Sequence, residues 1–126
     1  LKPRGVVAIW SCNLCYINAA IDKAVHHLYE DILGSYWEKE RKLVEEGYKN
    51  CIFPLEEMTP PKIEMSADWD FERLIGYFST WSALQNYIKK NNVNPLEQEA
   101  PKIKAAWGDQ KIRKVTWGLA LRVGRV

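Results

Sequence analysis

The stretch DFERLIGYFSTWSALQNYIKKN, residues 70–91, carries the clearest helix pattern in this chain. Its apolar residues recur at intervals of three and four positions, which is the spacing of one helix face. These residues are Phe71, Leu74, Ile75, Phe78, Trp81, Leu84 and Ile88. Asp70 suits an N-cap, and Asn91-Asn92 can adopt the left-handed conformation that ends a helix. The pattern therefore predicts one continuous helix that packs against the core.

A second line of side chains on this helix mixes aromatic and polar groups. Its members are Tyr77, Trp81, Ser82 and Gln85. Two interpretations stay open. The line is either the amphipathic edge of a core helix or one wall of a small-molecule pocket, since such walls combine apolar surface with a few polar groups.

Composition narrows the classes of protein to consider. A chain of 126 residues fits one domain, and a formal net charge of +2 argues against a nucleic-acid or membrane partner. The odd number of cysteines, Cys12, Cys15 and Cys51, favours free thiols in a reducing compartment, which we take to be the cytoplasm. The Cys12–Cys15 pair has no second pair at zinc-binding spacing, so we expect no metal site.

The apolar run Gly5–Trp10 predicts a strand that is covered on both faces, as in a parallel sheet. We expect Ser11–Tyr16 to be the loop that leaves its carboxyl end, where open α/β sheets bind ligands. The candidate binding residues in this loop are Ser11, Asn13 and Tyr16. The uncharged run 5–21 also has some likeness to a secretory signal, an alternative that its tryptophan, serine and asparagines disfavour.

The rest of the chain alternates between helix and strand patterns. We expect helices at 18–33, 37–46 and 96–107, a loop at 48–57, and strands at 62–69 and 115–123. A doubly wound sheet would need further strands before Leu1. The chain is therefore expected to be the last part of a larger α/β domain.

Several pieces of the sequence, taken in order, resemble a known family. Leu1–Trp10, LKPRGVVAIW, resembles the turn and fifth strand of class I S-adenosylmethionine (SAM) dependent methyltransferases, whose usual motif is L-K-P-G-G followed by an apolar strand. Later pieces are similar to the methyltransferase type 11 branch, which includes trans-aconitate methyltransferases. They are Tyr36-Trp37, Glu46-Gly47-Tyr48, Phe53-Pro54, Gly76-Tyr77, residues 80–83, Ala106-Trp107-Gly108 and Trp117–Arg122. Arg4 departs from the first glycine of the turn, and Gly118 stands where the family often has proline.

The resemblance implies a fold. Residues 1–126 would form the C-terminal portion of a single Rossmann-like α/β domain, namely the last three strands of its sheet. A helical cap, residues 69–110, would be inserted between the last two strands. The final strand would lie between the first strand and Lys62–Trp69. Tyr77, Trp81 and Ser82 would face the methyl acceptor, with the Ser11–Tyr16 loop opposite.

The resemblance also implies a function, which is methyl transfer from SAM to a small-molecule acceptor. The family's glycine-rich SAM loop, G-x-G-x-x-G or a near variant, does not occur in these 126 residues. No cofactor-binding residue is therefore expected within this chain, and the sequence identifies no catalytic residue. The alternative is a truncated, non-catalytic relative that acts as a binding or interaction module.

Overall fold

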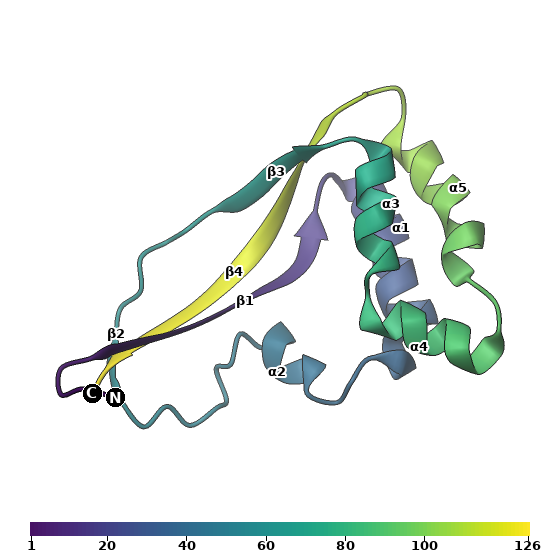
Figure 1. Ribbon diagram of the computed structural model, residues 1–126. Helices are drawn as coiled ribbons and strands as arrows, with labels where there is room; N and C mark the ends of the chain where they lie inside the picture. The colour runs from purple at the N-terminus through teal and green to yellow at the C-terminus, as the bar shows by residue number, and fades with distance from the viewer. The chain divides into compact units, whose positions relative to one another are not determined.

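The computed structural model describes residues 1–126 and contains both helices and strands (Figure 1). In chain order these elements are β1 (Val6–Tyr16), α1 (Ala19–His26), α2 (Arg41–Glu45), β2 (Glu56–Met58), β3 (Met65–Trp69), α3 (Phe71–Ser79), α4 (Ser82–Asn91), α5 (Pro95–Trp107) and β4 (Arg113–Arg125). The chain divides into two compact units. The sheet unit comprises Leu1–Cys15, Lys39–Ser66 and Thr116–Val126, and the helical unit comprises Tyr16–Glu38 and Ala67–Val115.

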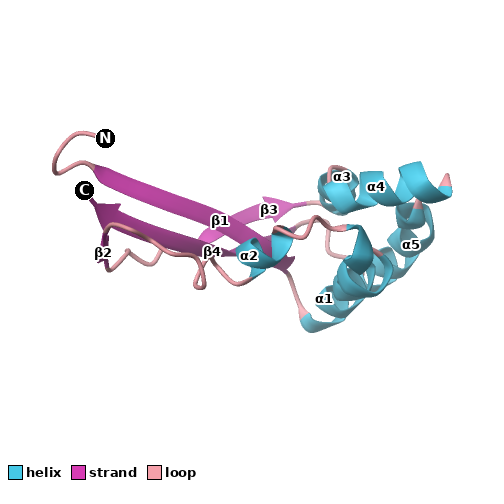
Figure 2. Ribbon diagram, turned by 90° about the horizontal axis from the view of Figure 1, so that it is seen from below, coloured by secondary structure: helices cyan, strands magenta, loops and turns pink.

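Strand β4 is the centre of the sheet. It lies between β1 and β2, and β3 also pairs with it (Figure 2). The β2–β4 ladder is antiparallel and aligns Glu56 with Arg125 and Met58 with Val123. The α/β class and the predicted order of the first, final and 62–69 strands are confirmed. Strand β2 was not predicted, because its residues fall at the end of a segment that was expected to be a loop.

Strand β1 differs from its prediction in two ways. The prediction of a loop at Ser11–Tyr16 is wrong, because β1 continues through these residues to Tyr16. Its neighbour β4 is 13 residues long, so it offers backbone partners well beyond Trp10. The expected burial of both faces is not found either, since Val6 is 57% exposed and Trp10 is 67% exposed. In these 126 residues β1 is an edge strand with uncovered apolar side chains.

The predicted helix 70–91 is two helices, α3 and α4. Its ends are as expected: the Asp70 carboxylate accepts a hydrogen bond from the Arg73 amide at 2.8 Å, and Asn92 ends α4 with φ 55°. The break falls at Trp81, whose backbone is extended. The hydroxyls of Ser79 and Thr80 donate to backbone carbonyls three residues earlier, a local competition that weakens helices.

The predicted helix 18–33 is confirmed with one local change. Asn18 caps it by accepting a hydrogen bond from the Ile21 amide at 2.9 Å. Its last turn, His27–Ile32, is a π-helical turn in which the Leu33 amide donates to the Leu28 carbonyl. This wider turn shifts the buried face by one residue. Leu33 is therefore fully buried, whereas Ile32, one position earlier, is only half-buried.

Helix α5 packs against α1 and α3 in the helical unit. It begins after Asn94, whose side chain accepts a hydrogen bond from the Leu96 amide at 3.0 Å, and it is ended by Gly108, which has φ 76°. The completely or almost completely buried side chains of this unit form its core; they are Ile21, Val25, Leu28, Leu33, Leu74, Phe78, Ala83, Leu84, Ile103, Trp107 and Val115. The short helix predicted at 37–46 is confirmed only over Arg41–Glu45.

Candidate functional site

Two of the sequence-predicted site residues, Ser11 and Asn13, lie in the sheet unit within strand β1. Side chains two positions apart share one face of a strand. The Ser11 hydroxyl oxygen and the Asn13 amide oxygen are both buried and have no hydrogen-bond partner. Buried polar atoms nearly always have a partner, so a water molecule or a polar group of a ligand is expected beside these two atoms.

The other candidates lie in the helical unit. Tyr16 ends β1 and is 57% exposed. Trp81 is 8% exposed, and its ring is 6.1 Å from that of the half-buried Tyr77 in an edge-on arrangement. Trp81 also packs against further rings, at centroid distances of 4.5 to 5.6 Å; these are Phe78, Trp37 and Tyr29. The structure therefore brings Tyr77 and Trp81 together inside an aromatic cluster.

Ser82 begins α4 next to this cluster but is exposed. Its hydroxyl donates to the Glu38 carboxylate at 3.0 Å. The nearby Gln85 amide donates to the Ser79 carbonyl at 2.9 Å. Ser82 and Gln85 thus make contacts at the surface, whereas Tyr77 and Trp81 contribute ring surface. That these residues face a methyl acceptor stays a prediction.

An ion pair between Glu57 and Arg122 was not predicted from the sequence. The Arg122 Nε and Nη2 atoms donate to the two Glu57 carboxylate oxygens at 2.8 and 2.9 Å. Through these hydrogen bonds, Arg122 holds the pKa of the Glu57 carboxyl below its ordinary value, and Glu57 raises the pKa of Arg122. An arginine inside the otherwise apolar run of the final strand is the signal that could have identified this pair.

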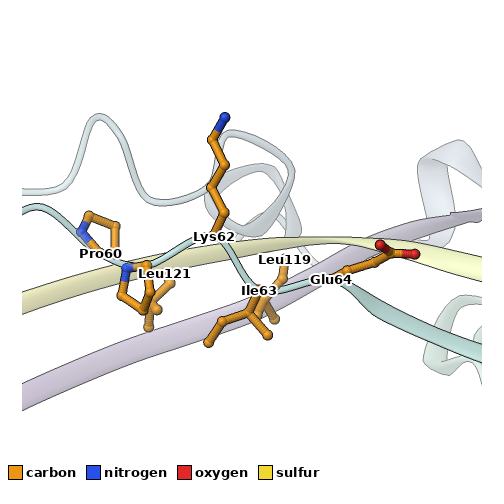
Figure 3. A pocket seen from close by; sticks show the side chains of 7 residues that line it. Pro60, Lys62, Ile63, Glu64, Leu119 and Leu121 are labelled. Carbon is orange, nitrogen blue, oxygen red and sulfur yellow. The ribbon is translucent and has the colours of Figure 1, made fainter.

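A groove of about 680 Å³ lies between the segment 60–64 and β4 in the sheet unit (Figure 3). Its lining residues are Pro60, Pro61, Lys62, Ile63, Glu64, Leu119 and Leu121. Proline has no backbone N–H to donate to a ladder. The two prolines therefore explain why the chain runs beside β4 here without forming a strand. Figure 3 shows the Ile63 side chain beside Leu119, with the Lys62 side chain directed away from them.

The groups needed for metal chemistry or for a SAM cradle are not assembled here. No three His, Cys, Asp or Glu side chains cluster as metal ligands, and the cysteines are free thiols. A SAM cradle presents open backbone amides of a glycine-rich turn at a helix N-terminus. The turns that lead into α1 and α3 contain no glycine and are capped by Asn18 and Asp70. The residues at these turns do not fit the cofactor.

None of the helices has the length and apolar character needed to cross a bilayer.

No protein-family model matches the chain. A Dictyostelium discoideum protein that is provisionally named as a methyltransferase is 31% identical to this chain over an alignment of 124 residues. The alignment covers 93% of this chain and 47% of that protein. A solved structure from Anaeromyxobacter dehalogenans, described likewise as a type II methyltransferase, matches with a TM-score of 0.91 and 34% identity.

The structural match covers 98% of this chain and 53% of that one. The chain thus spans about half the length of the curated relative and of the solved structure it matches. Agreement in sequence and in fold extends over nearly the whole chain. The chain is therefore a relative of these methyltransferases and corresponds to a part of one.

Proposed function

We propose that the protein containing this chain is a SAM-dependent methyltransferase for a small molecule, and that the chain forms its acceptor side. The observation that carries this proposal is the match to the Anaeromyxobacter methyltransferase structure, at a TM-score of 0.91 over 98% of the chain. The sequence similarity to the Dictyostelium protein supports it independently. The SAM cradle would lie in the part of the protein outside these 126 residues.

The chemistry of methyl transfer is compatible with the residues found here. When bound, SAM would supply a methyl group that passes to the acceptor as its bond to the sulfonium sulfur breaks, with S-adenosylhomocysteine as the leaving group. The protein contributes mainly by orienting the acceptor and excluding water. It needs neither a nucleophile nor a metal of its own. The side chains of this chain would therefore bind and orient the acceptor without changing covalently.

Two groups of residues are suited to that role, each within its own unit. The Asn13 amide oxygen and the Ser11 hydroxyl can take hydrogen bonds from a donor, because both are without a partner. The half-buried Tyr77 offers its ring to an apolar part of an acceptor, and the Trp81 ring packs against it at 6.1 Å. We expect Asn13 to contribute more to orientation than Tyr77, because an unpaired buried oxygen strongly favours ligands that satisfy it.

The test is a methyl-transfer assay on the full-length protein with methyl-labelled SAM and a library of small metabolites. Asn13→Ala should lower kcat/KM for the accepted substrate while the Kd for SAM stays unchanged. Glu56→Gln is the control, since Glu56 is an exposed side chain of β2 outside both groups of residues. A full-length protein that neither binds SAM nor labels any metabolite would contradict the proposal and favour a non-catalytic module.

A further inference from the structure

The segment Gly47–Leu55, here called the strap, lies in the sheet unit and is tied to β4 by one side chain, Arg122. The Arg122 Nη1 atom donates to the backbone carbonyls of Tyr48 and Cys51 at 2.7 and 2.8 Å. These residues are more than 70 positions away in sequence, at separations of 74 and 71. The Arg122 side chain is only 16% exposed, so most of it is enclosed by these contacts.

The same guanidinium also holds the strap through its other edge and its face. Its Nε and Nη2 atoms form the paired hydrogen bonds to Glu57 in β2, directly after the strap. Its Cζ atom lies 4.7 Å from the centre of the Phe53 ring, within cation–π range. Arg122 therefore contacts the strap near its beginning, middle and end. Because the planar guanidinium carries donors in a fixed fork, lysine could not reproduce this set.

The strap begins with backbone conformations that need outside support. Gly47 and Tyr48 both have left-handed φ values, 63° and 58°. Glycine tolerates this region, but a bulky side chain such as tyrosine is disfavoured there. Strained residues persist only where surrounding contacts hold them. The hydrogen bond from Arg122 to the Tyr48 carbonyl is such a contact, because it acts on the disfavoured residue itself.

The strap fits closely onto β4 at one end and leaves a space at the other. A Cβ atom on Gly124 would lie 2.5 Å from Phe53 Cε1 and 2.8 Å from Leu55 Cβ, so only glycine allows this approach. Near Gly47, a cavity of about 340 Å³ remains against β4. The cavity is lined by Gly47, Lys49, Glu57, Ala120, Leu121 and Arg122. Moving the strap away would open this cavity and uncover the Phe53 contact with Arg122.

We infer that Arg122 is a latch: it holds the strap closed on β4, and loss of its contacts opens the strap locally while the helical unit stays folded. The latch does not rest on the proposed methyl transfer, because none of its contacts involves Ser11, Asn13, Tyr77 or Trp81. It depends on hydrogen bonds to a charged donor, which contribute more than neutral ones.

Hydrogen exchange of the full-length protein, read by peptide mass spectrometry, tests the latch. The Cys51 amide donates to the Tyr48 carbonyl at 3.1 Å, so its exchange reports on closure of the strap. Arg122→Lys should speed exchange in the peptide 48–55 by about tenfold or more, because two charge-assisted bonds to carbonyls are lost. Exchange in the helical peptide 19–33 should not change. Glu57→Gln, a milder variant, should give a smaller increase in the same peptide.

Glu56→Gln is the matched control, since Glu56 precedes Glu57 in β2 and its side chain points to the other face of the strand. It should leave exchange of the strap unchanged. Unchanged exchange in both Arg122→Lys and Glu57→Gln would overturn the latch and assign closure to the packing of Phe53 on Gly124. An equal increase in peptides 48–55 and 19–33 would also overturn it, because Arg122 would then support the whole fold.

Discussion

Replacing Trp81 with alanine should separate a core role from a role in the acceptor site. Trp81 is 8% exposed, and its ring lies within 6.1 Å of several other rings. Removing a buried tryptophan side chain costs about 3–5 kcal/mol, combining lost burial with the cavity left behind. The extended backbone of Trp81, between α3 and α4, cannot easily collapse to fill that space. We therefore expect Trp81→Ala to lower the free energy of unfolding by about 3–5 kcal/mol.

The measurement is urea unfolding of the full-length protein, followed by circular dichroism. Ser82→Ala is the control, because Ser82 is the next residue, is exposed, and makes a surface hydrogen bond to Glu38. It should change the free energy of unfolding by no more than about 0.5 kcal/mol. A loss below about 1 kcal/mol for Trp81→Ala, well under the range for core aromatics, would refute the core role. If such a variant also lost kcat/KM at unchanged SAM affinity, Trp81 would belong to the acceptor site.

Three further predictions concern the sheet unit. Gly124→Ala should lower the free energy of unfolding by about 1–3 kcal/mol in urea titrations, because the added Cβ would overlap Phe53; a variant of wild-type stability would show that the strap yields freely. Arg4→Gly should raise the free energy of unfolding by about 1 kcal/mol, because Arg4 has φ 64°, a conformation that glycine adopts without strain; a loss of stability would show that Arg4 is not strained. Arg122 lowers the pKa of Glu57, so the contribution of this pair is complete above the ordinary glutamate pKa of about 4.3 and is lost as pH falls through the lowered value. An NMR titration of the Glu57 carboxyl should show this lowered pKa and its return toward the ordinary value in Arg122→Lys, and an unshifted pKa in the unmodified protein would exclude the pair.

Sequence patterns predicted most of the helices correctly, because helix formation depends mainly on residues that are close together in the chain. Apolar spacing and capping residues such as Asp70 and Asn18 located the helices of the helical unit. The break at Trp81 was missed, because the apolar period continues across it and the competing hydroxyl contacts of Ser79 and Thr80 are weak signals. Spacing alone could not separate one bent helical segment from two helices.

The errors in the sheet have a different cause, which is that pairing joins distant residues. The continuation of β1 depends on the length of β4, and β2 exists only through its ladder with β4. The Arg122–Glu57 pair spans 65 positions, so the local sequence shows Arg122 as unusual in an apolar run but does not identify Glu57 as its partner. Of the candidate site, the closeness of Tyr77 and Trp81 was expected from helix spacing, but the helix ends before Trp81 and the two rings meet across the break. The unpaired oxygens of Ser11 and Asn13 could not be inferred, because burial of β1 side chains depends on the tertiary structure.

Calorimetric titration with SAM tests the central claim most directly, using the full-length protein and the purified, monomeric 126-residue chain in parallel. The claim is that this chain forms the acceptor side of a SAM-dependent methyltransferase and holds no SAM cradle. Its strand-to-helix turns are closed by Asn18 and Asp70 and contain no glycine. Micromolar binding is therefore expected for the full-length protein, with no detectable heat for the chain alone. Micromolar binding by the chain alone, or none by the full-length protein, would contradict the claim.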